Sequence, residues 1–315
     1  MADQADKLRG LRLVPGGAPA DGNAQPSRRG RQEDSTREAR PAIPARPRVR
    51  SFALTSGKGG VGKTSIATNL AIAFARQGRR VLLVDGDLSL ANVDLLLGVV
   101  PQKNLGDVIF GGASIEQVVL KTVDGVLLLP SASGVGELAD LDDFRRERLL
   151  RELARLEDSV ELILLDTGSG IGRQTIHFAR AADDVVVVTT PEPTAFSDAY
   201  ATLKILSQGR LRGRPGIVVN MAASPEEGRE TERRIRLVTE RFLHLKPEYL
   251  GHIALDPSVG RAVRQQQPLL TAFPGSPAAA GIEALAARLL VEPPWPEPSE
   301  ADPEGFFLKM ANFDG

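Results

Sequence analysis

Short apolar runs recur along the chain from about residue 48, and segments with the apolar period of a helix separate them. We expect strands at about 51–55, 81–85, 126–129, 161–166, 184–189, 215–220 and 249–253, because these runs are short and rich in Val, Ile and Leu. Such runs with helices between them indicate a doubly wound α/β fold whose sheet is mostly parallel and buried on both faces. A ligand would then bind at the carboxyl ends of the strands.

The two ends of the chain lack this alternation. We divide the chain into a short helical segment at 1–12, a disordered linker at 13–47, a main domain at 48–291, a second linker at 292–304 and a final segment at 305–315. The first linker is rich in Gly, Pro, Arg, Ser and Glu with few large apolar residues, and the second is rich in Pro and acids. The main domain would end with a helix at about 278–291.

The final segment contains a short apolar stripe. Phe306, Phe307, Met310 and Phe313 are spaced so that they lie on one face of a helix. We assign them to membrane contact, although acidic residues flank the segment and basic residues, which strengthen binding to anionic lipid, are scarce. Burial against the protein's own surface is the alternative.

Composition narrows the possible functions. A chain of 315 residues with 42% hydrophobic residues can bury a sizeable core, whereas a net charge of −1 argues against a strongly basic nucleic-acid binder. The absence of cysteine excludes disulfides, thiolate metal sites and a cysteine nucleophile. No apolar run is long enough to cross a bilayer, and the N-terminus lacks the apolar core of a signal peptide. We expect a cytoplasmic protein whose membrane contact, if any, is peripheral at the inner face of the cell membrane.

A glycine-rich loop lies between the first predicted strand and a helical pattern that follows it. Nucleotide binding is assigned to Gly57, Lys58, Gly59, Gly60, Val61, Gly62, Lys63, Thr64 and Ser65. The glycines let backbone N–H groups close around phosphate oxygens, and the helix N-terminus favours the negative charge. Lys63 can reach the β- and γ-phosphates, while the Thr64 hydroxyl can bind Mg²⁺. The strand, loop and helix order makes a P-loop far better supported than an ordinary glycine-rich turn.

Three carboxylates and one amide follow other predicted strands. Asp85 and Asp87 end the second strand, and Asp166 ends a long apolar run, as a Walker B element requires. We assign Asp85 and Asp166, with Thr64, to Mg²⁺, and Asp87 to the attacking water. In the alternative interpretation, these aspartates are only polar strand ends or helix-capping residues without a catalytic role. Asn220 is assigned to the purine base, although an Asn at a strand end is more often a turn former.

The remaining polar residues suggest no other catalytic centre. The three histidines are scattered without ligand spacing, and there is no Ser/His/Asp arrangement. Hydrolysis would therefore depend on Mg²⁺ and positioned charges instead of a covalent nucleophile.

The loop and the carboxylates together resemble a known class of enzymes. Residues 58–64, with Asp85, Asp87 and Asp166, are similar to the deviant Walker A ATPases of the MinD/ParA class. The resemblance implies a slow, Mg²⁺-dependent ATPase that forms a homodimer with ATP. In that class Lys58 would reach across the dimer to the partner's nucleotide, and Lys63 would bind its own nucleotide. We therefore count both lysines and Asp87 as catalytic.

Within this class the chain resembles the FlhG family, also called FleN or YlxH, which regulates flagellar number and placement. The resemblance rests on Asp3, Gln4, Ala5, Leu8 and Arg9, which are similar to the family's DQAxxLR motif, on residues 85–98, on 190–200, on 219–221 and on 262–264. The motif implies an SRP-type GTPase resembling FlhF as a partner. Flagellar switch or C-ring components, a flagellar transcription regulator and membrane lipid are further partners that the family implies.

Two related functions stay open. A ParA-like DNA-partition ATPase could use a basic patch formed by Arg210, Arg212, Arg214, Arg229, Arg233, Arg234 and Arg236, although such runs are usually solvated helix faces. A MinD-like regulator of division-site position explains the ATPase and the tail but leaves residues 3–9 unexplained.

Overall fold

The computed structural model describes residues 49–87, 92–122, 124–131, 141–209, 211, 215–291 and 305–312. The strands in this part of the chain are β1 (Arg50–Ser56), β2 (Val81–Gly86), β3 (Leu120–Lys121), β4 (Leu127–Leu129), β5 (Leu162–Ser169), β6 (Asp184–Thr189), β7 (Gly216–Ala222) and β8 (Glu248–Ala254). They form one sheet in the order β3-β4-β2-β5-β1-β6-β7-β8, in which β3 runs antiparallel to β4 and the other neighbours are parallel. The predicted mostly parallel, doubly wound sheet is therefore confirmed.

The observed strands lie where the apolar runs predict them, with small changes at their ends. β5 continues to Ser169, beyond the predicted end at Asp166, because it pairs with β1 as far as Ser56. β3 has only two residues, which is too short for any apolar period to reveal. The sequence therefore missed this strand alone among those described.

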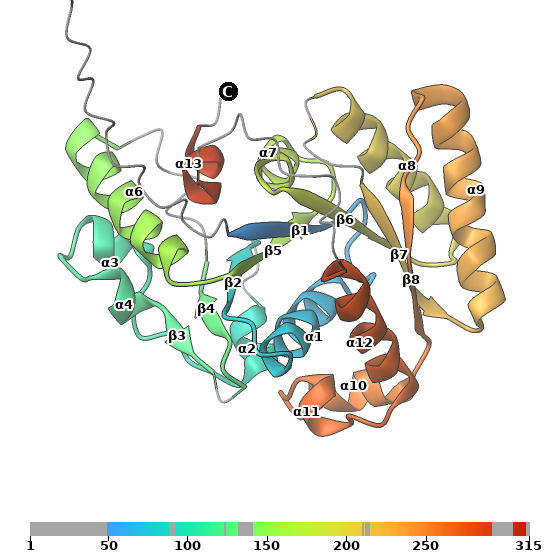
Figure 1. The fold of residues 1–315 in the computed structure, drawn as a ribbon, viewed down its shortest axis with the longest axis horizontal. Helices are drawn as coiled ribbons and strands as arrows, with labels where there is room; N and C mark the ends of the chain where they lie inside the picture. Colours follow the sequence, from blue (N-terminus) through green and yellow to red (C-terminus); the bar gives the residue numbers. More distant parts are fainter. Residues whose placement is uncertain are drawn as a thin grey trace, which may run out of the picture. The chain divides into compact units, whose positions relative to one another are not determined.

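Helices cover both faces of the sheet (Figure 1). One face packs against α1 (Lys63–Arg76), α2 (Val93–Leu97), α10 (Pro257–Arg264), α11 (Leu269–Ala272) and α12 (Pro277–Leu289). The other face packs against α3 (Leu105–Ile109), α4 (Ile115–Val118), α6 (Asp143–Asp158), α7 (Arg173–Ala181), α8 (Pro193–Ser207), α9 (Pro225–Leu243) and α13 (Phe306–Ala311). In β5, Ile163 and Leu165 face one core and Leu164 faces the other, as the two-residue period of a strand requires.

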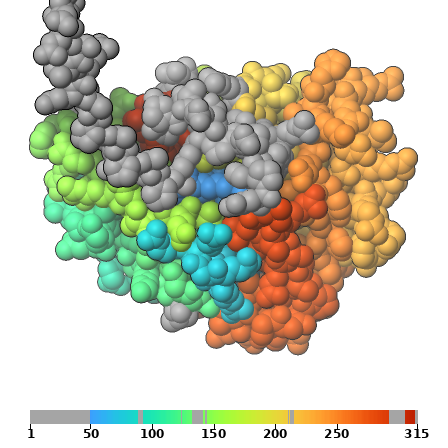
Figure 2. All heavy atoms as spheres, in the orientation of Figure 1, coloured from blue at the N-terminus to red at the C-terminus, as the bar shows by residue number. Residues whose placement is uncertain are grey.

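Chain segments far apart in sequence meet on the face that carries α1. Figure 2 shows the cyan segment with α2 beside the orange and red segments that form α10 to α12. Here a Cβ atom at Gly98 would lie 3.1 Å from the carbonyl oxygen of Gln266. Gly98 also has a φ of 63°, so glycine suits this contact in both space and backbone conformation.

Candidate functional site

The phosphate loop connects β1 to α1, as its sequence predicts. Gly62 precedes the helix with φ 86° and ψ 15°, a left-handed conformation that glycine adopts without steric cost. A Cβ atom there would also lie 2.4 Å from the Asn220 Nδ2 atom. At Gly57, a Cβ atom would lie 2.3 Å from the carbonyl oxygen of Asp198 in α8. The loop is therefore packed tightly between β7 and α8, with the N-terminus of α1 available to an anion.

Lys63 and Asp166 form a buried ion pair at the base of this loop. The Lys63 Nζ atom lies 2.6 Å from Asp166 Oδ1, and the side chains are 6% and 1% exposed. Burial raises the pKa of Asp166, while the Lys63 charge and a hydrogen bond from Thr64 oppose that rise. The second oxygen of Asp166, Oδ2, is buried and has no hydrogen-bond partner. Asp166 thus holds the lysine with one oxygen and keeps the other for a further ligand.

Asp85 lies beside Asp166 because β2 and β5 pair in register at these two residues. Burial, and to a smaller extent the neighbouring Asp166 carboxylate, raise the pKa of Asp85 to about 7. The backbone N–H groups of Asp87 and Val93 donate to Asp85 at 3.1 and 3.4 Å. Two buried carboxylates close together repel each other when both are charged. A cation bound between them would offset that repulsion.

The donor set fits Mg²⁺ bound with a nucleotide. Carboxylate and hydroxyl oxygens are hard donors, and Mg²⁺ usually takes only one or two carboxylates besides water and phosphate oxygens. Asp85, Asp166 and Thr64 supply such atoms from β2, β5 and α1. Among the described residues there is no group of three or more His, Cys, Asp or Glu arranged around one ion.

Lys58 has an environment very different from that of Lys63. Its Nζ atom lies 3.0 Å from Glu192 Oε2 and 3.1 Å from Thr194 Oγ1, at the start of α8. Its side chain is 40% exposed. No pattern in the sequence predicted these partners. The Pro191-Glu192-Pro193 run after β6 was the signal that could have identified them.

Asn220 contacts the phosphate loop itself. Its Nδ2 atom donates to the carbonyl oxygen of Val61 at 2.8 Å, and the residue is buried. The next residue, Met221, has a φ of 57°, which is uncommon for a residue with a side chain. The amide therefore supports the loop, and its role in recognising a base stays a prediction.

Asp87 lies at the edge of the same group, directly after β2. A Cβ atom at Gly168 would be 3.9 Å from its Oδ1 atom, so Asp87 lies near the segment that follows Asp166. The N–H group of Gly170 in that segment donates to the carbonyl oxygen of Ser56 at 2.8 Å. The structure thus brings together Asp87, Asp85, Asp166 and the phosphate loop.

The tail helix α13 is docked between α6 and α7. Phe306, Phe307 and Met310 are buried there, which agrees with burial against the protein's own surface, the alternative left open by the sequence. Phe313 lies outside the described residues. The helix expected in the final segment at 305–315 spans Phe306–Ala311.

Polar contacts also hold α13, and the sequence predicted none of them. Glu157 Oε1 accepts the N–H of Phe306 at 2.7 Å, and the Nε2 atom of His177 lies 3.0 Å from the carbonyl oxygen of Met310. Lys309 is only 8% exposed, and its Nζ atom lies 3.8 Å from Asp183 Oδ1. Burial raises the pKa of Glu157, and the N–H groups of α13 partly oppose this. We call Glu157, His177 and Asp183 the tail socket.

The arginines considered as a DNA-binding patch are paired with acids where they are described. Arg229, Arg233, Arg234 and Arg236 bind glutamates three or four residues away along α9. Arg210, Arg212 and Arg214 lie outside the described residues, as do Asp3, Gln4, Ala5, Leu8 and Arg9. The described part of this face is a solvated helix surface with both signs of charge. It gives no support to DNA binding.

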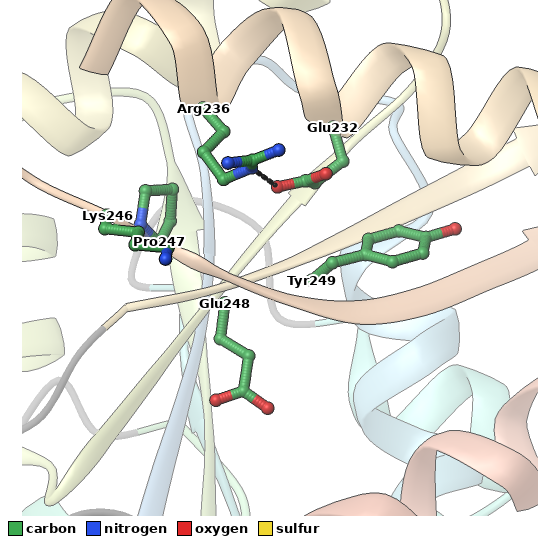
Figure 3. Close-up of a pocket in the computed structure, with 6 residues that line it drawn as sticks. All are labelled: Glu232, Arg236, Lys246, Pro247, Glu248 and Tyr249. Carbon is green, nitrogen blue, oxygen red and sulfur yellow. Dashed lines mark hydrogen bonds and ion pairs between the residues drawn. The ribbon is translucent and has the colours of Figure 1, made fainter. Parts of the chain in front are cut away.

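A cavity of about 320 Å³ lies away from the phosphate loop, between α9 and the start of β8 (Figure 3). Its lining contains Glu232, Arg236, Lys246, Pro247, Glu248 and Tyr249. Arg236 Nε lies 3.1 Å from Glu232 Oε1, and Arg288 pairs with Glu248, so most of the charges are already matched. The cavity contains none of the predicted nucleotide ligands and is a poor candidate for the nucleotide site.

No helix in the described part of the chain is both long and apolar enough to span a membrane.

Comparison with known proteins identifies the family. Residues 52–269 match the model of the CobQ/CobB/MinD/ParA nucleotide binding domain. The chain is 41% identical to the antiactivator FleN of Pseudomonas aeruginosa, over 83% of this chain and 92% of that protein. It is 35% identical to the flagellum site-determining protein YlxH of Helicobacter pylori, over 76% of this chain and 81% of that protein.

A solved structure is similar to this chain in fold. The septum site-determining protein MinD of Pyrococcus horikoshii, complexed with Mg-ADP, superposes with a TM-score of 0.60 at 25% identity, over 76% of this chain and 96% of that one. The chain belongs to the MinD/ParA family of ATPases, in the group that contains FleN and YlxH.

Proposed function

We propose that this protein is a slow, ATP-dependent dimerising switch that regulates flagellar number and placement. The single observation that carries the proposal is the contrast between the two lysines of the phosphate loop. Lys63 is buried on Asp166, whereas Lys58 is at the surface, 40% exposed. A buried lysine can serve its own nucleotide, and an exposed one can serve the nucleotide of a second copy. The similarity to FleN and YlxH supports the flagellar role.

The proposed hydrolysis uses groups that the fold already brings together. Lys63 exchanges Asp166 for phosphate oxygens when ATP binds, while loop N–H groups and the α1 N-terminus hold the phosphates. Asp85, Asp166 and Thr64 would hold Mg²⁺, which neutralises charge on the phosphates. Asp87 orients the attacking water, and Lys58 of the second copy stabilises the charge that develops on the phosphoryl group. Asn220 would contact the base.

Sizing of the full chain by light scattering tests the dimer. With ATP and Mg²⁺ the parent protein should shift to a dimer, and Lys58→Ala should abolish the shift while ATP affinity stays measurable. Lys246→Ala, which removes an exposed lysine from the cavity beside α9, is the matched control and should dimerise like the parent. A normal dimer from Lys58→Ala would refute the trans role of Lys58.

The partner proposed for residues 1–12 is an SRP-type GTPase resembling FlhF. Gln4 offers an amide that could orient a water, Leu8 offers an apolar edge, and Arg9 can pair with carboxylates or phosphates. A synthetic peptide of these residues should accelerate GTP hydrolysis by that GTPase, and the Gln4→Ala peptide should lose most of the effect. An inert peptide with an active full chain would place the activating surface on the ATPase domain.

The other proposed partners are flagellar switch components, C-ring components and a flagellar transcription regulator. A pull-down with the full chain, with and without ATP, would show whether any of them binds. Membrane lipid is the partner proposed for Phe306, Phe307, Met310 and Phe313 after α13 leaves the tail socket. These four residues would then bind peripherally at the inner face of the membrane.

A further inference from the structure

Glu192 and Thr194 hold Lys58 from within the same chain. The Lys58 Nζ atom lies 3.0 Å from a Glu192 carboxylate oxygen and 3.1 Å from the Thr194 hydroxyl oxygen. The ammonium group therefore donates to one charged and one neutral acceptor. Two acceptors restrict its position more than the single partner of an ordinary surface ion pair does.

The backbone around Lys58 is arranged to keep this contact. The Ser56 hydroxyl donates to the carbonyl oxygen of Lys58 at 2.9 Å. The adjacent Gly57 lies so close to α8 that a Cβ atom would come within 2.3 Å of the Asp198 carbonyl oxygen. The loop therefore lies directly on the helix that carries Glu192 and Thr194, and this proximity keeps Lys58 within reach of both.

Glu192 occupies the N-cap position of α8 without capping the helix. Its side chain makes no cap hydrogen bond, and glutamate is not among the residues that favour this position. Its carboxylate binds Lys58 instead. In the structure, the Glu192 carboxylate therefore binds Lys58 and does not cap the helix. Its negative charge is also favourable near the start of a helix.

We propose that Glu192 and Thr194 form a latch that holds Lys58 in cis and must release it before the ATP dimer forms. The inference rests on the proposed function, in which Lys58 reaches the nucleotide of a second copy. One ammonium group cannot bind Glu192 of its own chain and a distant phosphate at once, so the two contacts compete. The latch opposes dimerisation and makes Glu192 a positioning residue.

The first test measures Lys58 directly, without any dimer. The full chain with Mg-ADP is treated briefly with an amine-acylating reagent, and labelling of Lys58 is measured by mass spectrometry against Lys246 as an internal reference. Glu192→Gln should raise the labelling rate of Lys58 about two- to fivefold, which is the range expected for an exposed ion pair. Glu226→Gln is the matched control, because Glu226 also forms an exposed pair with an arginine at the start of a helix. An unchanged rate in Glu192→Gln would overturn the latch.

The second test measures the dimer. Glu192→Gln should lower the dissociation constant of the ATP dimer about two- to fivefold, with unchanged ATP affinity, and Glu226→Gln should match the parent. An unchanged dissociation constant in Glu192→Gln would overturn the latch. A higher dissociation constant would also overturn it, because the carboxylate would then contribute to the dimer contact. Lys58→Ala separates the two proposals. If it dimerises normally the proposed function fails, whereas the labelling result still reports whether Glu192 holds Lys58.

Discussion

Truncation of Phe307 should release the tail helix from its socket. Phe306, Phe307 and Met310 are buried, and burial of such a side chain contributes about 1.5–3 kcal/mol, so roughly 5–9 kcal/mol in total. Ordering the 6 residues of α13 costs roughly 6–12 kcal/mol of backbone entropy. The contacts with Glu157, His177 and Asp183 add a few kcal/mol at about 1 kcal/mol each. Docking is therefore marginal.

Phe307→Ala removes about 3 kcal/mol from this small balance, the lower end of the range for a buried Phe. That loss corresponds to about a 100-fold increase in the equilibrium ratio of undocked to docked tail helix, since 1.4 kcal/mol is a factor of 10. Amide hydrogen exchange across 306–311, measured by mass spectrometry, should therefore accelerate to nearly the rate of an unstructured segment. Exchange in α12 should not change, because its buried residues pack in the core on the other face of the sheet.

Leu308→Ala is the matched control for this experiment. Leu308 is on the same helix and is 37% exposed, so its truncation should change exchange by less than about threefold. If Phe307→Ala leaves α13 protected, or if both variants release it equally, the energies assigned to the docked face are wrong.

Three further predictions concern catalysis, pH and the membrane. Asp87→Ala should trap an ATP dimer with little turnover, and hydrolysis at the parental rate would show that Asp87 does not position the water. Burial raises the pKa of Asp184 from 3.8 to about 6, so its stabilising effect is complete below about pH 4 and is lost as the pH rises through 6. Between pH 4 and 7 this group should lower the unfolding free energy by about 2 kcal/mol, so in urea titrations the free energy of Asp184→Asn should be higher at pH 7, relative to pH 4, than that of the parent by about this amount; an unchanged pH dependence would contradict the burial argument. Liposome flotation should be stronger with ATP than with ADP, and equal flotation in both states would exclude a nucleotide-controlled tail.

The sequence by itself determined the elements whose cause is local. Seven of the described strands are apolar runs that no helical period explains, and the phosphate loop is set by glycines that allow left-handed backbone at positions such as Gly62. The carboxylates at the ends of β2 and β5 could be expected to meet, because parallel strands end at the same edge of a sheet.

Only the tertiary structure decided which groups these residues contact. Lys58 pairs with Glu192 because Gly57 packs on α8, and the tail helix lies on Glu157 and His177 because α6 and α7 are neighbours on one face of the sheet. No periodic pattern encodes such contacts, since the partners lie more than a hundred residues apart in the chain and each could pair with many charges of opposite sign. Packing of the two helical layers removes those alternatives, and so it selects the partners of Lys58 and α13.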